Sequence, residues 1–77
     1  MIKMKEFQAT VDCIIIDKCR KVVGSQAFEV KVLGNSRGEA IIAALDVGQA
    51  LARSANSSKG ERAIYFRVTN IAEISMA

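Results

Sequence analysis

Histidine is absent from this 77-residue sequence, and its two cysteines do not form a Cys-x-x-Cys motif. Zinc sites and redox centres need clusters of histidine or cysteine at short, defined spacings. The sequence therefore predicts neither a metal site nor a redox centre. We interpret Cys13 and Cys19 as small apolar residues on a packed face.

The sequence also lacks the residue patterns typical of catalysis. No nucleophile stands beside a general base, and no carboxylate pair is placed on one element for acid–base catalysis. Asp12 and Asp17 are expected to be solvated, because acid–base catalysis needs a cleft and a shifted pKa. We expect a protein that is not an enzyme and has no cofactor.

Long apolar runs, a signal sequence and internal repeats are absent as well. We therefore expect a cytoplasmic protein that does not interact with membranes, with residues 1–77 forming a single domain. The composition, 51% hydrophobic and 25% charged, is ordinary for one globular domain. Because so short a chain builds only a small core, we expect a homodimer or a larger homo-oligomer.

The charge is basic without a long run of like charges. Eleven lysines and arginines against eight acidic residues give a net charge of +3, and the pI is about 9.1. This balance is compatible with nucleic-acid binding, provided that the cations gather on one face.

The clearest predicted element is a helix that begins after Ser36 and runs to about Ser54. Ser36 and Glu39 have the spacing of a capping box, and apolar residues recur at helical spacing behind them. Gly34 and Asn35 allow a sharp turn before the helix. The helix N-terminus exposes backbone N–H groups beside Arg37, where a phosphate could bind.

Two strands are predicted from strict alternation. Residues 27–33 place Phe28, Val30 and Val32 on one face. Residues 61–70 place Ile64, Phe66 and Val68 on one face and Ala63, Tyr65, Arg67 and Thr69 on the other. Residues 1–7 predict either a short opening strand or a frayed terminus, and residues 55–60 predict an exposed loop. Residues 71–77 predict an extension of the strand, a short edge strand or a frayed end.

Residues 8–24 support two interpretations. Alternating apolar residues from Phe7 to Ile15 and the β-branched composition favour a strand. Thr10 as an N-cap, Gly24 as a terminator and three basic residues before it favour a helix. We predict a helix, because both of its ends are explained. In the alternative, Phe7 to Ile16 is a strand and the fold begins with a hairpin.

The segment Arg37-Gly38-x-Ala40-Ile41-x-x-Ala44-x-Asp46-Val47, preceded by the strand Glu29-Val30-Lys31-Val32, resembles the core signature of the Alba proteins, which are small nucleic-acid binders. The resemblance implies an α+β two-layer sandwich, βαβαβ(β), with a mixed sheet and two helices on one face. It also implies that Arg37 and Gly38 lie on the nucleic-acid surface. The chain also resembles, more faintly, the sporulation stage V protein S family, whose end is similar to Gly60-Glu61-Arg62-Ala63-Ile64. Unlike Alba proteins, this chain has no proline after its first lysines, Lys3 and Lys5, and it carries Glu39 after the Arg-Gly pair.

The predicted function is sequence-independent binding of DNA or RNA through phosphate contacts. The candidate binding residues are Arg37, Gly38, Lys59, Arg67, Tyr65, Lys3 and Lys5. The alternative is an assembly or adaptor module that binds a protein or a small ligand. A continuous basic stripe through Arg37 would favour the first function, and a mixed or apolar patch would favour the second.

Overall fold

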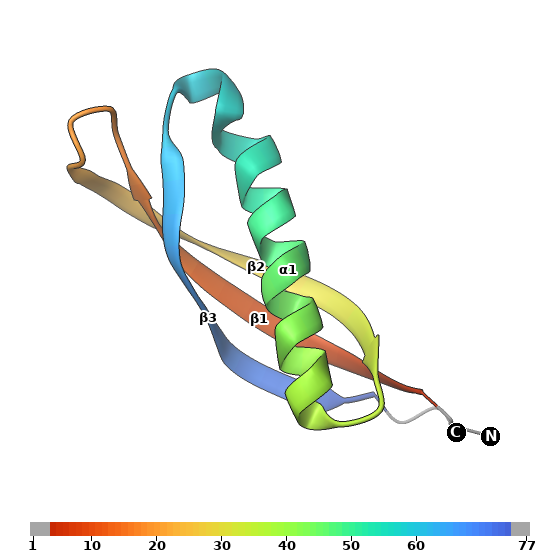
Figure 1. The fold of residues 1–77 in the computed structure, drawn as a ribbon. Helices are drawn as coiled ribbons and strands as arrows, with labels where there is room; N and C mark the ends of the chain where they lie inside the picture. Colours follow the sequence, from red (N-terminus) through yellow and green to blue (C-terminus); the bar gives the residue numbers. More distant parts are fainter. Residues whose placement is uncertain (1–3, 75–77) are drawn as a thin grey trace.

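The computed structural model describes residues 4–74, which form a three-stranded sheet and one long helix (Figure 1). In chain order the elements are strand β1 (Lys5–Ile16), strand β2 (Val22–Gly34), helix α1 (Arg37–Asn56), the short 3-10 helix η1 (Ser57–Lys59) and strand β3 (Arg62–Glu73). The protein is therefore of the α+β class. The molecule is elongated, measuring 49 × 19 × 18 Å.

The sheet has the strand order β2-β1-β3, and β1 pairs antiparallel with both neighbours. Because β1 lies between them, β2 and β3 run in the same direction, and α1 connects them across one face of the sheet (Figure 1). Within residues 4–74, no helix covers the other face.

The core lies between the sheet and α1, and small residues on the helix bring it close to the central strand β1. Alternate residues of β1, from Phe7 to Ile15, are buried against the helix. The helix buries every fourth residue, all of them small or polar: Ala40, Ala44, Gly48, Ala52 and Asn56. A Cβ atom added at Gly48 would lie 2.7 Å from Val11 Cγ1, so only glycine fits at this crossing.

The capping signals at the start of α1 are confirmed. The Glu39 N–H donates to Ser36 Oγ at 3.3 Å, and the Asn35 N–H donates to Glu39 Oε2 at 2.7 Å. Ser36 is the N-cap, with extended backbone, as the sequence predicts.

The helix predicted for residues 8–24 is wrong: this segment forms β1, a loop and the start of β2. The fold consequently has one long helix rather than two, an antiparallel rather than a mixed sheet, and it begins with a hairpin. β1 is the central strand, so it pairs with a neighbouring strand on each side. This pairing stabilises the extended conformation that its β-branched residues already favour. Asp17 Oδ1 accepts hydrogen bonds from the N–H groups of Cys19 and Lys21, which stabilises a turn rather than the end of a helix.

The two strands predicted from alternation are confirmed, and β3 extends to Glu73. Residues 55–60, predicted as a loop, instead contain the end of α1 and η1. The predicted face of Ile64 is wrong. Tyr65 has φ 56°, and the register shifts there, from Asp12 opposite Arg67 to Ile14 opposite Ile64. This β-bulge turns Ile64 away from the face on which Phe66 packs against the core.

Candidate nucleic-acid interface

The predicted corner at the start of α1 carries mixed charge. Arg37 is exposed and, with Lys5 and Glu73, lines a hollow of about 320 Å³. Lys5 Nζ lies 3.7 Å from Glu73 Oε1, and both side chains are about half exposed. An anion that approached Arg37 would therefore meet a carboxylate as well as two cations.

Gly38 is not required by the backbone at this corner. Its φ is not positive, and an added Cβ would meet only Ser36 Oγ, at 3.9 Å. A side chain at this position would thus be accommodated without a clash. Gly38 exposes its backbone at the first turn of α1, but the fold itself does not demand glycine there.

The structure does not bring the predicted binding residues together. Arg37 begins α1, whereas Lys59 lies in η1 beyond its other end, about 30 Å away by the rise of a helix. Tyr65 and Arg67 lie on β3 between these two points, and Arg67 is opposite Asp12 in the sheet. Lys3 lies outside the described residues.

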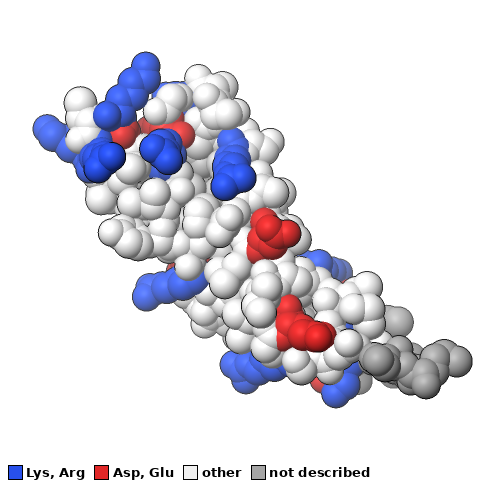
Figure 2. Space-filling model, in the orientation of Figure 1, with Lys and Arg blue, Asp and Glu red and all other residues white. Residues whose placement is uncertain are grey.

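Most of the positive charge gathers at the other end of the molecule, where the β1–β2 loop, the end of α1, η1 and the start of β3 meet. Figure 2 shows this concentration of basic side chains, with acidic side chains over the middle of the visible face. We call this region the basic end, and it comprises Lys18, Arg20, Lys21, Arg53, Lys59 and Arg62.

The basic end differs clearly in charge from the rest of the chain. It holds six of the eleven lysines and arginines, but only two of the eight acidic residues, Asp17 and Glu61. The rest of the sequence has five cations and six carboxylates. The net positive charge of the protein therefore resides at this end, which is the distribution that phosphate binding requires.

Local structure fixes the loops of the basic end. Asp17 organises the β1–β2 loop, since its backbone N–H also donates to the Lys21 carbonyl and its own carbonyl accepts from the Arg20 N–H, both at 3.0 Å. The Lys18 side chain lies against Gly60, because a Cβ built there would be 2.9 Å from Lys18 Cε. The β1–β2 loop and the turn after η1 are thus in contact.

A hollow of about 440 Å³ opens on the sheet beside the basic end. Its apolar lining comes from all three strands, and one aromatic side chain and two guanidinium groups complete it. The lining residues are Ile16, Arg20, Val22, Arg62, Ile64 and Tyr65.

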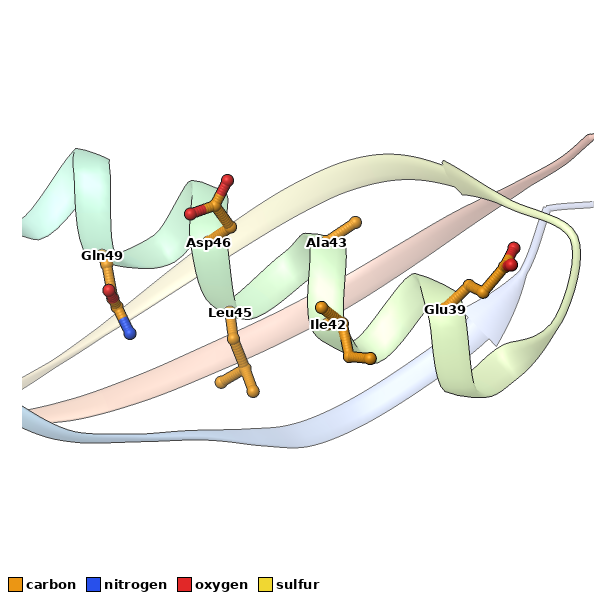
Figure 3. Close-up of a pocket in the computed structure, with 6 residues that line it drawn as sticks. All are labelled: Glu39, Ile42, Ala43, Leu45, Asp46 and Gln49. Carbon is orange, nitrogen blue, oxygen red and sulfur yellow. The ribbon is translucent and has the colours of Figure 1, made fainter.

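The outward side of α1 is different in character. Figure 3 shows six helix residues around a shallow hollow: Glu39, Ile42, Ala43, Leu45, Asp46 and Gln49. Ile42 is 71% exposed. This surface carries two carboxylates and no cation, so it does not suit a phosphate. A mixed apolar patch of this kind suits a protein partner better.

Within residues 4–74, no group of three side chains is arranged to hold a metal ion, and α1 is not apolar enough to cross a membrane.

The pKa of the Cys13 thiol is raised, mainly because the thiol is buried. A hydrogen bond with the Gln26 backbone lowers this pKa, and the nearby Asp12 carboxylate raises it. Cys13 is buried, as predicted, whereas Cys19 is exposed in the β1–β2 loop.

Sequence reasoning missed Lys18, Arg20, Lys21 and Arg62 as candidate binding residues. The first three were assigned to the last turn of the helix that does not form. The signal that could have revealed them is the density of cations in two short segments, residues 18–21 and 59–62.

No family model, curated protein or solved structure matches this chain. The function must therefore be argued from the surface itself.

Proposed function

We propose that this protein binds DNA or RNA without sequence preference, mainly through the basic end. The observation that carries the proposal is the separation of charge: one end has six cations and two carboxylates, and the rest of the sequence is close to neutral. Such a cluster attracts a polyanion by releasing its counterions, without reading the bases. The resemblance to the Alba proteins gives this proposal weaker support. The fold begins with a β-hairpin, whereas the resemblance implies a strand followed by a helix.

The proposal is tested by titrating fluorescently labelled single-stranded and duplex oligonucleotides at several salt concentrations. The first variant removes three exposed cations of the basic end, with Lys18, Lys21 and Lys59 changed to Gln. The matched control removes three cations elsewhere, with Lys5, Lys31 and Arg37 changed to Gln. Both variants have the same net charge, so only the location of the lost charge differs.

We expect the wild type to bind at low salt, with an affinity that falls steeply as salt rises. The basic-end variant should reduce the slope of log K against log salt by about 2 to 3, since each lost phosphate contact removes about 0.7–0.9 from the slope. The control should change the slope by less than about 1. Equal losses in both variants would overturn the assignment to the basic end, and no binding by the wild type at low salt would overturn the function.

The Arg-Gly corner has its own test. Gly38→Ala is sterically tolerated and keeps the charge, so a loss of affinity in this variant would place the backbone of the corner on the nucleic acid. Arg37→Ala tests the side chain. Because Glu73 lies in the same hollow, we expect both variants to bind nearly as well as the wild type.

A second candidate function is an assembly module, and the exposed Ile42 on the outward side of α1 favours it. The proposed partner is a second copy of the chain, because the small core leaves apolar side chains on the helix uncovered. Light scattering at increasing protein concentration tests this. We expect a dimer that Ile42→Asp dissociates, and a wild type that stays monomeric would rule it out.

A further inference from the structure

The hollow beside the basic end combines an apolar floor, an aromatic ring and two guanidinium groups, and no carboxylate within residues 4–74 lines it. Ile16, Val22 and Ile64 give it an apolar floor, Tyr65 supplies an aromatic ring, and guanidinium groups come from the β1–β2 loop and from β3. Val22 is 67% exposed and Tyr65 is 76% exposed, so both side chains are accessible to a ligand.

The register of the sheet places this hollow on the face away from α1. Ile16 is opposite both Val22 and Arg62, so these three side chains form one row across the sheet. Ile15, its neighbour, packs against Ala52 of α1 on the opposite face. The hollow is therefore open to a ligand and is not covered by the helix.

Both residues with a positive φ other than glycine, within residues 4–74, line this hollow: Arg20 with φ 64° and Tyr65 with φ 56°. Side chains with a Cβ rarely adopt this conformation, because the Cβ atom crowds the following carbonyl oxygen. The positive φ of Tyr65 coincides with the β-bulge in β3, and the tyrosine ring there is exposed. Residues in such conformations often belong to binding sites, where their placement matters more than local stability.

We propose that this hollow receives an unpaired base of single-stranded DNA or RNA. The base stacks on Tyr65 above the apolar floor, and Arg20 and Arg62 bind the adjacent phosphates. This inference rests on the proposed function and narrows it, because a base within a duplex is stacked on its neighbours and cannot reach the ring. Stacking on an aromatic side chain beside a positive groove is how single strands are bound without sequence preference.

The occupant is a strand rather than a free nucleotide for two reasons. The hollow lies partly open to solvent, whereas sites for small molecules enclose most of their ligand. Further cations, including Lys18 and Lys21, continue beyond it along the loop, and only a chain of several phosphates would use them.

The sequence offers a direct probe of this site. Tyr65 is the one tyrosine, and there is no tryptophan, so the intrinsic fluorescence of the protein reports on this ring alone. We expect a single-stranded oligonucleotide to quench the fluorescence to saturation, because the base stacks on the ring. A duplex of equal length should bind through the cations with little quenching. A free tyrosine amide, titrated in parallel, corrects for absorption by the nucleic acid.

Two variants separate the ring from the backbone. Tyr65→Phe keeps the ring, and Tyr65→Asn removes it while tolerating a positive φ. We expect Tyr65→Phe to bind labelled single strands within about 2-fold of the wild type, and Tyr65→Asn to bind about 10-fold more weakly, with duplex affinity unchanged. Circular dichroism of Tyr65→Asn checks that the fold is retained.

The outcomes distinguish this inference from the function on which it rests. Binding of single strands and duplexes with equal affinity, no quenching and no effect of Tyr65→Asn would overturn the inference and leave the function standing. No binding of either would overturn both. Equally tight quenching by a mononucleotide and by a longer strand would overturn the assignment to single strands.

Discussion

The side-chain amides of Gln26 and Asn56 hydrogen-bond to each other in both directions. Asn56 Nδ2 donates to Gln26 Oε1 at 3.1 Å, and Gln26 Nε2 donates to Asn56 Oδ1 at 3.4 Å. Asn56 Nδ2 also donates to the Ala52 carbonyl at 2.7 Å. Asn56 is the last residue of α1 and is only 1% exposed, so the amide pair fastens the end of the helix to β2.

Asn56→Ala should lower the free energy of unfolding by about 1–3 kcal/mol, because it removes a buried hydrogen-bonding group and leaves its partner unpaired. Gln26→Ala should cost less, since Gln26 is partly exposed and water can replace it. Urea denaturation measures both. The double variant should cost less than the two single variants together, and strict additivity would show that the two amides do not interact.

Gly48→Ala should destabilise the protein by about 1–3 kcal/mol, partly offset by up to about 1 kcal/mol of helix propensity. The added methyl group would collide with Val11, which has no room to move in the core. Gly38→Ala in the same helix is the matched control, because its methyl group would make only an ordinary contact, with Ser36 Oγ at 3.9 Å. Thermal and urea unfolding should show opposite signs for the two variants. Stabilisation by both would contradict the close approach of α1 to β1.

Arg20→Gly should be more stable than Arg20→Ala by about 1 kcal/mol, because glycine adopts the positive φ of this position without a steric cost. Both variants lose the same charge, so both should bind nucleic acid more weakly than the wild type. Unfolding by urea measures the first effect, and the oligonucleotide titration measures the second. Equal stability of the two variants would argue against a left-handed residue in the β1–β2 loop.

Cys13 should make the protein less stable at alkaline pH. Burial raises the pKa of its thiol above the ordinary value of 9.0, so the unfolded chain loses this proton at a lower pH than the folded protein does. The contribution to stability is complete below about pH 9 and is lost as the pH rises through the folded pKa. Urea unfolding from pH 8 to 10.5 measures the effect. Cys13→Ala should flatten the pH dependence relative to the wild type, and Cys19→Ala, which changes an exposed thiol, should not.

The start of α1 and the strands around Val30 and Phe66 were predictable because their signals are local. The Ser36–Glu39 capping box joins residues three apart, and alternation within one strand needs no knowledge of its neighbours. The bulge at Tyr65 was not predictable in this way. It is a shift in the register of β3 against β1, which changes the face of Ile64 and depends on two strands that lie far apart in the sequence.

For residues 8–24 the local signals conflicted, and the tertiary structure decided between them. Thr10 and Gly24 resemble helix ends in sequence, but pairing with two neighbouring strands makes β1 the centre of the sheet. As a result, Lys18, Arg20 and Lys21 lie in the β1–β2 loop and not in the predicted helix, and Lys18 contacts Gly60. A contact between segments so distant in sequence depends on how the whole chain packs.

The sequence by itself determined the basic balance of charge, the α+β class and the site where α1 begins, because each depends on composition or on neighbouring residues. Only the tertiary structure decided where the charge gathers. The tertiary structure places the β1–β2 loop beside the start of β3, so Arg20, Arg62 and Tyr65 line one hollow. Arg37 lies at the other end of α1, in a hollow that it shares with the Glu73 carboxylate. The physical reason is that strand pairing and close packing act between residues that lie far apart in the chain.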